Sequence, residues 1–212
     1  VDTCHRRDGS QDFVIHTDGI VRLAAGSPSN CLGADCTAGV WLMTEMIEAG
    51  IAGRYVFHRG EERGGLGSRY VAGHEAGRLT GICAAIAFDR RGTHSIITYQ
   101  RGERCCSEAF AASLSQSLAL DHQSDPTGTF TDTANYTDLV GECTNLSVGY
   151  DHEHAPSETL DLEYLLRLRQ AMVAIDTNAL VISRKPGEVE LEPEYLYDDR
   201  EGAWTPRSTS LY

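Results

Sequence analysis

One apolar run constrains the fold of this chain more than any other stretch. Residues 82–88 read Ile-Cys-Ala-Ala-Ile-Ala-Phe, with no polar side chain to break the run. Strands without an alternation of apolar and polar residues are typical of sheets that other elements cover on both faces. We therefore predict a central strand here, buried on both sides. Asp89 follows directly, which places a carboxylate at the end of this strand.

Strand-like and helix-like segments alternate along the rest of the chain. Apolar runs predict buried strands at 13–15 and 55–57, and further strands at 94–99 and 143–149. Periodicity or segment length predicts helices at 40–50, 68–79, 107–120 and 160–173. Such alternation is typical of an α/β domain whose sheet is covered by helices.

Length and composition narrow the class of protein. The 212 residues suffice for one α/β domain and are short for two. We expect residues 1–176 to form a single catalytic domain and residues 177–212 an acidic C-terminal tail. The formal charge of −13 argues against a nucleic-acid partner, which needs a basic surface. No apolar run has the length of a membrane span, so we expect no membrane partner.

The cysteines bear on the compartment. There are seven, an odd number, and no two have the Cys-x-x-Cys spacing. This pattern favours reduced thiols inside a cell over a disulfide framework. The first residues also lack the apolar centre of a signal peptide, and the sequence therefore predicts a cytoplasmic protein.

Several polar side chains stand at or near the ends of predicted strands. His16 and Asp18 follow the run at 13–15 and share one face of an extended chain, so Asp18 could orient the His16 imidazole. Asp35 precedes a predicted helix, where it could act as an N-cap or as a metal ligand. His154 lies in a loop before the last predicted helix, and a plain surface position is the alternative.

Two adjacent carboxylates, Glu61 and Glu62, follow the run at 55–57 and precede a glycine-rich turn. Neighbouring side chains on an extended chain point to opposite sides. One carboxylate could therefore face a metal while the other faces a substrate. The alternative is a solvated charged turn, the usual place for glutamate.

Together these groups fit a centre of two divalent metal ions. A mixed set of imidazoles and carboxylates suits zinc, cobalt or manganese. Two ions with so few protein ligands need a bridging carboxylate, for which Asp35 is the candidate. Glu61 is then free to take a proton from an activated water and pass it to a leaving amine, which predicts amide hydrolysis. The predicted ligands are His16, Asp35, Glu62, Asp89 and His154.

Five short motifs occur in a specific order: His-Thr-Asp at 16–18, Gly-Ala-Asp at 33–35, Gly-Glu-Glu at 60–62, Phe-Asp at 88–89 and His-x-x-x-Glu at 154–158. In combination they resemble the co-catalytic di-zinc exopeptidase superfamily, which includes leucyl and glutamyl aminopeptidases, tripeptidases and the glutamate carboxypeptidase and aminoacylase group. The resemblance extends over about residues 13–173. It implies a three-layer αβα sandwich on a mixed, mostly parallel sheet. It also implies the five ligands above, with Asp35 as the bridge, Glu61 as general acid and base, and Asp18 orienting His16.

Three departures from the superfamily pattern concern the site. Cys36 stands where the bridging aspartate is commonly followed by a second Asp across a cis peptide bond. The chain between Asp89 and His154 has no room for the lid domain of many relatives, so Tyr136, Tyr150 and Arg63 become candidate donors to the transition state. Relatives also usually have a longer segment before the first histidine.

The leading interpretation is a di-metal, most simply di-zinc, aminopeptidase-type exopeptidase that cleaves small peptides. One alternative is a deacylase of N-acyl amino acids, or a carboxypeptidase, with the same centre; Arg90 or Arg91 would favour it by holding a substrate carboxylate. Another is a catalytically inactive relative that serves in binding or assembly. Asp132 is expected to position a substrate or to stabilise a turn. The oligomeric state does not follow from the sequence.

Overall fold

The structure is a computed structural model that describes residues 3–5, 11–190, 195–198 and 203–206. Its main sheet has four strands in the order β3-β8-β4-β7. Parallel pairs join β3 (Ala84–Arg90) to β8 (Glu142–Ser147) and β4 (Ser95–Ile97) to β7 (Gln123–Asp125), whereas β4 and β8 are antiparallel. The predicted mixed and mostly parallel sheet is therefore confirmed.

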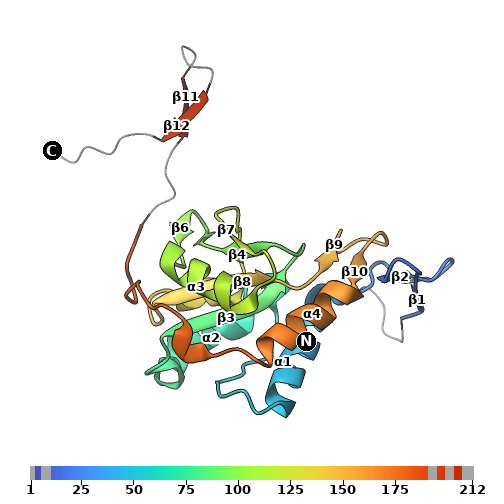
Figure 1. Ribbon diagram of the computed structural model, residues 1–212, viewed down its shortest axis with the longest axis horizontal. Coiled ribbons are helices and arrows are strands. Elements are labelled where there is room, and N and C mark those ends of the chain that lie inside the picture. The colour runs from blue at the N-terminus through green and yellow to red at the C-terminus, as the bar shows by residue number, and fades with distance from the viewer. Residues whose placement is uncertain (1–2, 6–10, 191–194, 199–202, 207–212) are drawn as a thin grey trace.

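A second, antiparallel sheet lies at one end of the molecule (Figure 1). Its strand order is β1-β2-β10-β9, formed by β1 (Phe13–Ile15), β2 (Ile20–Leu23), β10 (Thr159–Asp161) and β9 (Tyr150–Asp151). Two further hairpins are β5 (Tyr99–Gln100) with β6 (Glu103–Arg104), and β11 (Tyr195–Asp198) with β12 (Ala203–Pro206).

Helices cover both faces of the main sheet, as expected for a three-layer αβα domain. One layer contains α1 (Ala34–Glu48), α3 (Glu108–Leu118) and α4 (Leu162–Met172): α4 contacts both other helices, α1 contacts β3, and α3 contacts β4 and β7. In the other layer, α2 (Leu66–His74) packs on the short helix η3 (Asp132–Tyr136), which contacts β3 and β8. The remaining short helices are η1 (Glu61–Arg63), η2 (Ala76–Leu79) and η4 (Thr177–Ala179).

N-cap side chains fix where two of the helices begin, and a continuous apolar core holds the helices against the sheet. Ser107 caps α3 by accepting a hydrogen bond from the Phe110 amide, and Asp161 caps α4 by accepting one from the Tyr164 amide. The core side chains between helices and sheet are fully buried; they include Leu42, Ile96, Phe110, Leu114, Leu146 and Leu168. The helices predicted at 107–120 and 160–173 thus form as expected, each shorter at its ends.

Three strand predictions need correction. The run at 82–88 predicted a central strand, but β3 lies at the edge of the main sheet and is only partly buried. The fully buried strand of this sheet is its neighbour, β8. Residues 55–57 form no strand, and Phe57 is 46% exposed. β1 forms where predicted but is exposed along its length, because it belongs to a hairpin of the second sheet and not to the core.

The chain after residue 176 continues to pack on the domain. Ser183 and Arg184 each donate a backbone N–H to Glu142 Oε1, at 2.8 and 2.9 Å. The Arg184 guanidinium donates to the carbonyl of Gly141 at 2.6 Å. Residues 183 and 184 therefore pack against β8, whereas most of residues 177–190 are exposed; of the tail predicted for 177–212, residues 191–194, 199–202 and 207–212 lie outside the described residues.

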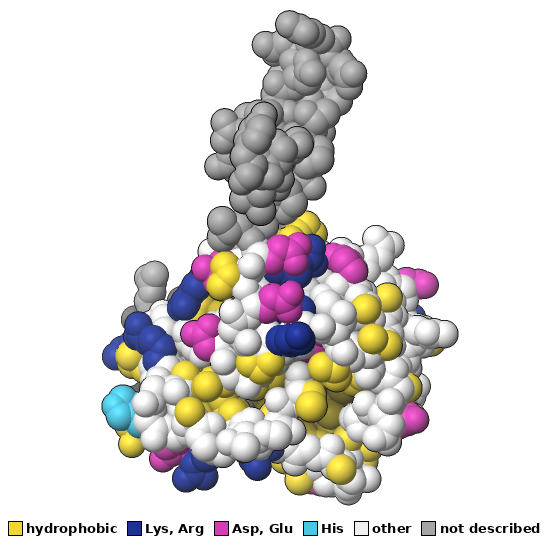
Figure 2. Space-filling model, turned by 90° about the vertical axis from the view of Figure 1, so that its left-hand side faces the viewer, with side chains coloured by type: hydrophobic (Ala, Val, Ile, Leu, Met, Phe, Trp, Pro, Cys, Tyr) yellow, Lys and Arg dark blue, Asp and Glu magenta, His cyan; other side chains and the backbone are white. Residues whose placement is uncertain are grey.

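Surface and cysteines agree with the composition. All seven cysteines are free thiols, as the irregular spacing predicted. Within the described residues, no helix has both the length and the apolar character needed to cross a membrane. On the face in Figure 2, charged side chains of both signs are scattered among uncharged and hydrophobic ones, so the described residues form no continuous basic surface there.

Candidate active site

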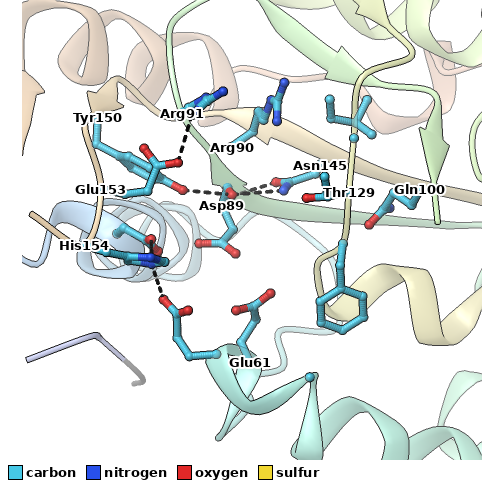
Figure 3. A pocket seen from close by; sticks show the side chains of 16 residues that line it. Glu61, Asp89, Arg90, Arg91, Gln100, Thr129, Asn145, Tyr150, Glu153 and His154 are labelled. Atoms are coloured by element: carbon cyan, nitrogen blue, oxygen red, sulfur yellow. Dashed lines mark hydrogen bonds and ion pairs between the residues drawn. The ribbon is translucent and has the colours of Figure 1, made fainter. Parts of the chain in front are cut away.

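A pocket of about 300 Å³ opens where the ends of several elements meet. Glu61 points into it from η1, Asp89 from the end of β3, and His154 from the loop after β9 (Figure 3). Asp35 and Glu62 line the same pocket. The structure thus gathers five residues from four separate places in the sequence.

A buried glutamate fixes the backbone that carries Asp35. Glu158 is 1% exposed. Its two carboxylate oxygens accept hydrogen bonds from the Gly33 amide at 2.8 Å and the Asp35 amide at 3.0 Å. The peptide bond between Asp35 and Cys36 is cis. The histidine and glutamate of the last sequence motif therefore have separate tasks, since His154 faces the pocket and Glu158 supports it from behind.

Close contact between α1 and β3 brings Asp35 near Asp89. Gly39 lies one turn along α1 from Asp35, and a Cβ atom there would stand 1.9 Å from the carbonyl oxygen of Phe88. Only a residue without a side chain allows this approach. Asp89 is the next residue after Phe88, so the glycine sets the spacing of the two carboxylates.

Neighbouring strands hold the backbone of Asp89. Its amide donates to Asn145 Oδ1, and the Asn145 amide group donates back to the Asp89 carbonyl, both at 3.0 Å. The Tyr150 hydroxyl also donates to that carbonyl at 3.0 Å. Thr131 donates to Asp89 Oδ2 at 3.1 Å, whereas Oδ1 is buried and has no hydrogen-bond partner among the described residues.

Contacts with η3 hold the turn that carries Glu61 and Glu62. Asp132 accepts a hydrogen bond from Ser68 at 2.5 Å, and its other oxygen lies 3.1 Å from His58 Nδ1. The second nitrogen of His58 is hydrogen-bonded to the Tyr136 hydroxyl. Residues on both sides of the turn are thereby tied to η3.

His154 faces two carboxylates at once. Its Nε2 atom is 2.7 Å from Glu62 Oε1 and 3.0 Å from Asp35 Oδ2. The residue has a φ of 64°, a left-handed conformation that is uncommon outside glycine and concentrates at functional sites.

The crowded carboxylates alter one another's acidity. Burial and the charge of Glu62 raise the pKa of Asp35 from 3.8 to about 6. Burial and the charges of Asp35 and Glu61 raise the pKa of Asp89 well above its ordinary value. Burial lowers the pKa of His154, but the charges of Glu62 and Asp35 outweigh this effect and raise it overall. The pocket therefore concentrates carboxylates, while the two arginines that line it, Arg90 and Arg91, pair with Asp125 and Glu153.

The remaining predicted site residues lie elsewhere or have other partners. His16 and Asp18 are exposed in the β1–β2 turn, outside the pocket, and Asp18 accepts hydrogen bonds from the Ile20 amide and from Arg22. Asp132 and Tyr136 lie behind the turn of η1 and do not line this pocket. Tyr150 lines the pocket, but its hydroxyl is engaged by the backbone of Asp89.

Sequence reasoning missed the groups that support the site. Asn145 lies in the middle of a predicted strand, where nothing in the local pattern distinguishes it from a surface amide. The signal for Gly39 was also slight, because a helix interior disfavours glycine and its presence there indicates a close contact.

The donor set fits divalent cations. The carboxylates of Asp35, Glu61, Glu62 and Asp89 and the imidazole of His154 face a shared space, which Glu153 also lines, and one buried oxygen of Asp89 has no partner among the described residues. Burial and mutual repulsion raise the pKa values of Asp35 and Asp89, and a bound cation would offset both effects. Asp35, Glu62, Asp89 and His154 could hold one or two such ions, and Glu61 could act on a substrate beside them.

Solved structures share this fold. No protein-family model and no curated protein matches the sequence. Aminopeptidase PepT from Bacillus cereus is similar at 15% identity, with a TM-score of 0.60 and coverage of 77% of this chain and 75% of that one. The TET1 peptidase of Pyrococcus horikoshii is similar at 22% identity, with a TM-score of 0.57 and coverage of 77% and 52%. An aminopeptidase from Desulfurococcus kamchatkensis follows at 19% identity, with a TM-score of 0.54 and coverage of 77% and 51%.

The fold inferred from the sequence motifs is therefore confirmed. At these identities the similarity establishes the fold alone. The chain spans about half the length of the TET1 peptidase structures it resembles.

Proposed function

We propose that this chain, which has the fold of those aminopeptidases, is the catalytic domain of a metal-dependent peptidase that cleaves residues from the amino end of small peptides. The observation that carries the proposal is the convergence of Asp35, Glu61, Glu62, Asp89 and His154 in one pocket on this fold. Carboxylates that are buried and crowded against one another, as Asp35 and Asp89 are, destabilise a purely structural domain. This cost argues against the inactive relative.

Four of these residues are the proposed metal ligands. Asp35 lies 3.0 Å from His154, and its carboxylate interacts with those of Glu62 and Asp89, so Asp35 is the ligand that two ions would share. Zinc is the expected metal, with cobalt or manganese as substitutes. When bound, the metal supplies a Lewis acid and lowers the pKa of water in the pocket. His16 has no part in the proposal, because it lies in the exposed β1–β2 turn.

Glu61 is the proposed general base and acid. Its carboxylate points toward Asp89 across the pocket (Figure 3). From there it can accept a proton from the attacking water and then deliver that proton to the leaving amine. The anchored turn between His58 and Ser68 keeps the carboxylate in place during both transfers.

A second candidate function has one specific observation in its favour. Arg90 and Arg91 both line the pocket, where they could hold the carboxylate of an N-acyl amino acid or of a C-terminal residue. Arg90 pairs with Asp125 at 3.1 Å, but the Arg91 side chain is 56% exposed and, among the described residues, pairs only with Glu153, at 3.2 Å. Of the two, Arg91 can exchange its partner for a substrate more readily.

A substrate panel tests the proposal. The zinc-loaded protein is assayed with aminoacyl-p-nitroanilides and with N-acetyl amino acids, beside Glu61→Gln and the exposed control Glu103→Gln. We expect hydrolysis of the anilides, reduced about 10²- to 10⁴-fold in Glu61→Gln with zinc content unchanged and unaffected in the control. Hydrolysis of the N-acetyl substrates alone, abolished by Arg91→Ala, would establish the deacylase instead. Bound zinc without turnover of either class would refute both enzymatic proposals.

A further inference from the structure

A cysteine that no motif singled out lies beside the proposed metal ligands. The thiol sulfur of Cys4, a carboxylate oxygen of Glu62 and a ring nitrogen of His154 all lie within 4.8 Å of one another. Cys4 and Glu62 are partly buried, whereas His154 is exposed. Three different ligand types thus surround one point at the edge of the pocket.

The segment that carries Cys4 is fixed to the loop before α1. The Asn30 amide donates to the Cys4 carbonyl at 2.8 Å, and a ring nitrogen of His5 lies 3.2 Å from the Cys31 carbonyl. The His5 ring also packs so closely on Gly33 that a Cβ atom there would approach it to 2.3 Å. The same loop leads into Asp35, so the thiol and the bridging carboxylate share one support.

The chemistry of these three groups suits one metal in particular. Zinc takes about four ligands in a tetrahedron and accepts thiolate, imidazole and carboxylate together. Glu62, His154 and a shared Asp35 would supply three of them and Cys4 the fourth, so the water of the proposed reaction would be activated beside Asp89, toward which Glu61 points. A soft thiolate favours zinc or cobalt over manganese and magnesium. The buried, unpartnered oxygen of Asp89 is a separate indication that the pocket is built for cations.

We propose that Cys4 is a ligand of the metal position formed by Glu62 and His154, and that its thiolate makes this position selective for zinc. On binding, the thiol releases its proton to solvent and the sulfur donates an electron pair to the metal, so no oxidant or reductant is needed. The proposal rests on the metal centre of the proposed function and adds a ligand that the sequence motifs do not contain.

Cobalt absorption tests the proposal directly. The metal-free protein is titrated with Co²⁺, and two signals are followed: the visible bands of bound cobalt, and the near-ultraviolet charge-transfer band that only a thiolate ligand produces. The variant is Cys4→Ser. The controls are Cys83→Ser, at an exposed cysteine, and Cys36→Ser, beside Asp35.

We expect the charge-transfer band in the wild type and in both controls, and its loss in Cys4→Ser with the visible bands retained. In a metal competition experiment, the preference for zinc over manganese should be at least about tenfold lower in Cys4→Ser than in the wild type. Visible bands without a charge-transfer band in the wild type, or a band that persists in Cys4→Ser, would overturn the role of Cys4 and leave the metal centre intact. No cobalt binding by any form would overturn the proposed function as well.

Discussion

At the scale of single residues, the site is a set of carboxylates held closer together than is favourable for ionised groups. Asp35 shows this best, because burial and the Glu62 charge raise its pKa to about 6. A carboxyl group whose pKa is higher in the folded state stabilises the fold only while it is protonated. Below pH 3.8 its contribution is fully present, and it is lost as the pH rises through about 6.

The metal-free protein should therefore lose stability through Asp35 as the pH rises from 4 to 7. We expect the free energy of unfolding of the wild type, minus that of Asp35→Asn, to fall by about 2–3 kcal/mol over this interval. Urea unfolding in the presence of a chelator measures this difference at each pH. Asp151→Asn, at an exposed carboxylate, is the control. A difference that stays flat, or rises with pH, would mean that Asp35 is not under this strain.

Single residues also show which parts of the site could be predicted from the sequence and which could not. Asp35, Glu61, Glu62, Asp89 and His154 were predicted and do share a pocket, because short motifs at the ends of elements carry local information. His16 was predicted from the same kind of motif, yet its strand joins the second sheet through β2 and β10. Which sheet a short strand joins depends on distant pairing partners, and no local pattern records them.

At the scale of elements, the contact of α1 with β3 sets the geometry of the site. The helix can approach the strand closely only because position 39 has no side chain. The position of β3 was the main error at this scale. An apolar run indicates burial, but α1 and η3 pack beside β3 and supply much of that burial without a further strand.

Gly39→Ala should force α1 away from β3. The added methyl group would overlap the Phe88 carbonyl, and we expect a loss of stability of about 2–4 kcal/mol together with weaker zinc binding, because Asp35 moves away from Asp89. Thermal unfolding and zinc titration measure the two effects.

Gly73→Ala is the matched control for that substitution. Gly73 also lies inside a helix, but a Cβ atom there meets nothing within 4 Å. The helix should gain up to about 1 kcal/mol from the exchange, and zinc binding should not change. Equal behaviour of the two variants would show that the close approach at Gly39 does not position the site.

At the scale of the whole molecule, the alternation of segments predicted the αβα class correctly, because helix and strand periods are read locally. The contacts of Ser183 and Arg184 with β8 were not predicted. Glu142 is fully buried in β8 and accepts hydrogen bonds from the backbone of Ser107, Ser183 and Arg184. Nothing in the local sequence indicates that one glutamate in a strand will hold together the N-terminus of a helix and a distant segment of the chain.

The account as a whole depends on the pocket being a metal centre. The most direct test is elemental analysis of the chain after reconstitution with zinc and removal of excess metal, with Asp35→Asn analysed in parallel. We predict about two equivalents of zinc per chain in the wild type and at most one in the variant, which lacks the shared carboxylate. A zinc content near zero in the wild-type protein, confirmed as folded by circular dichroism, would contradict the account.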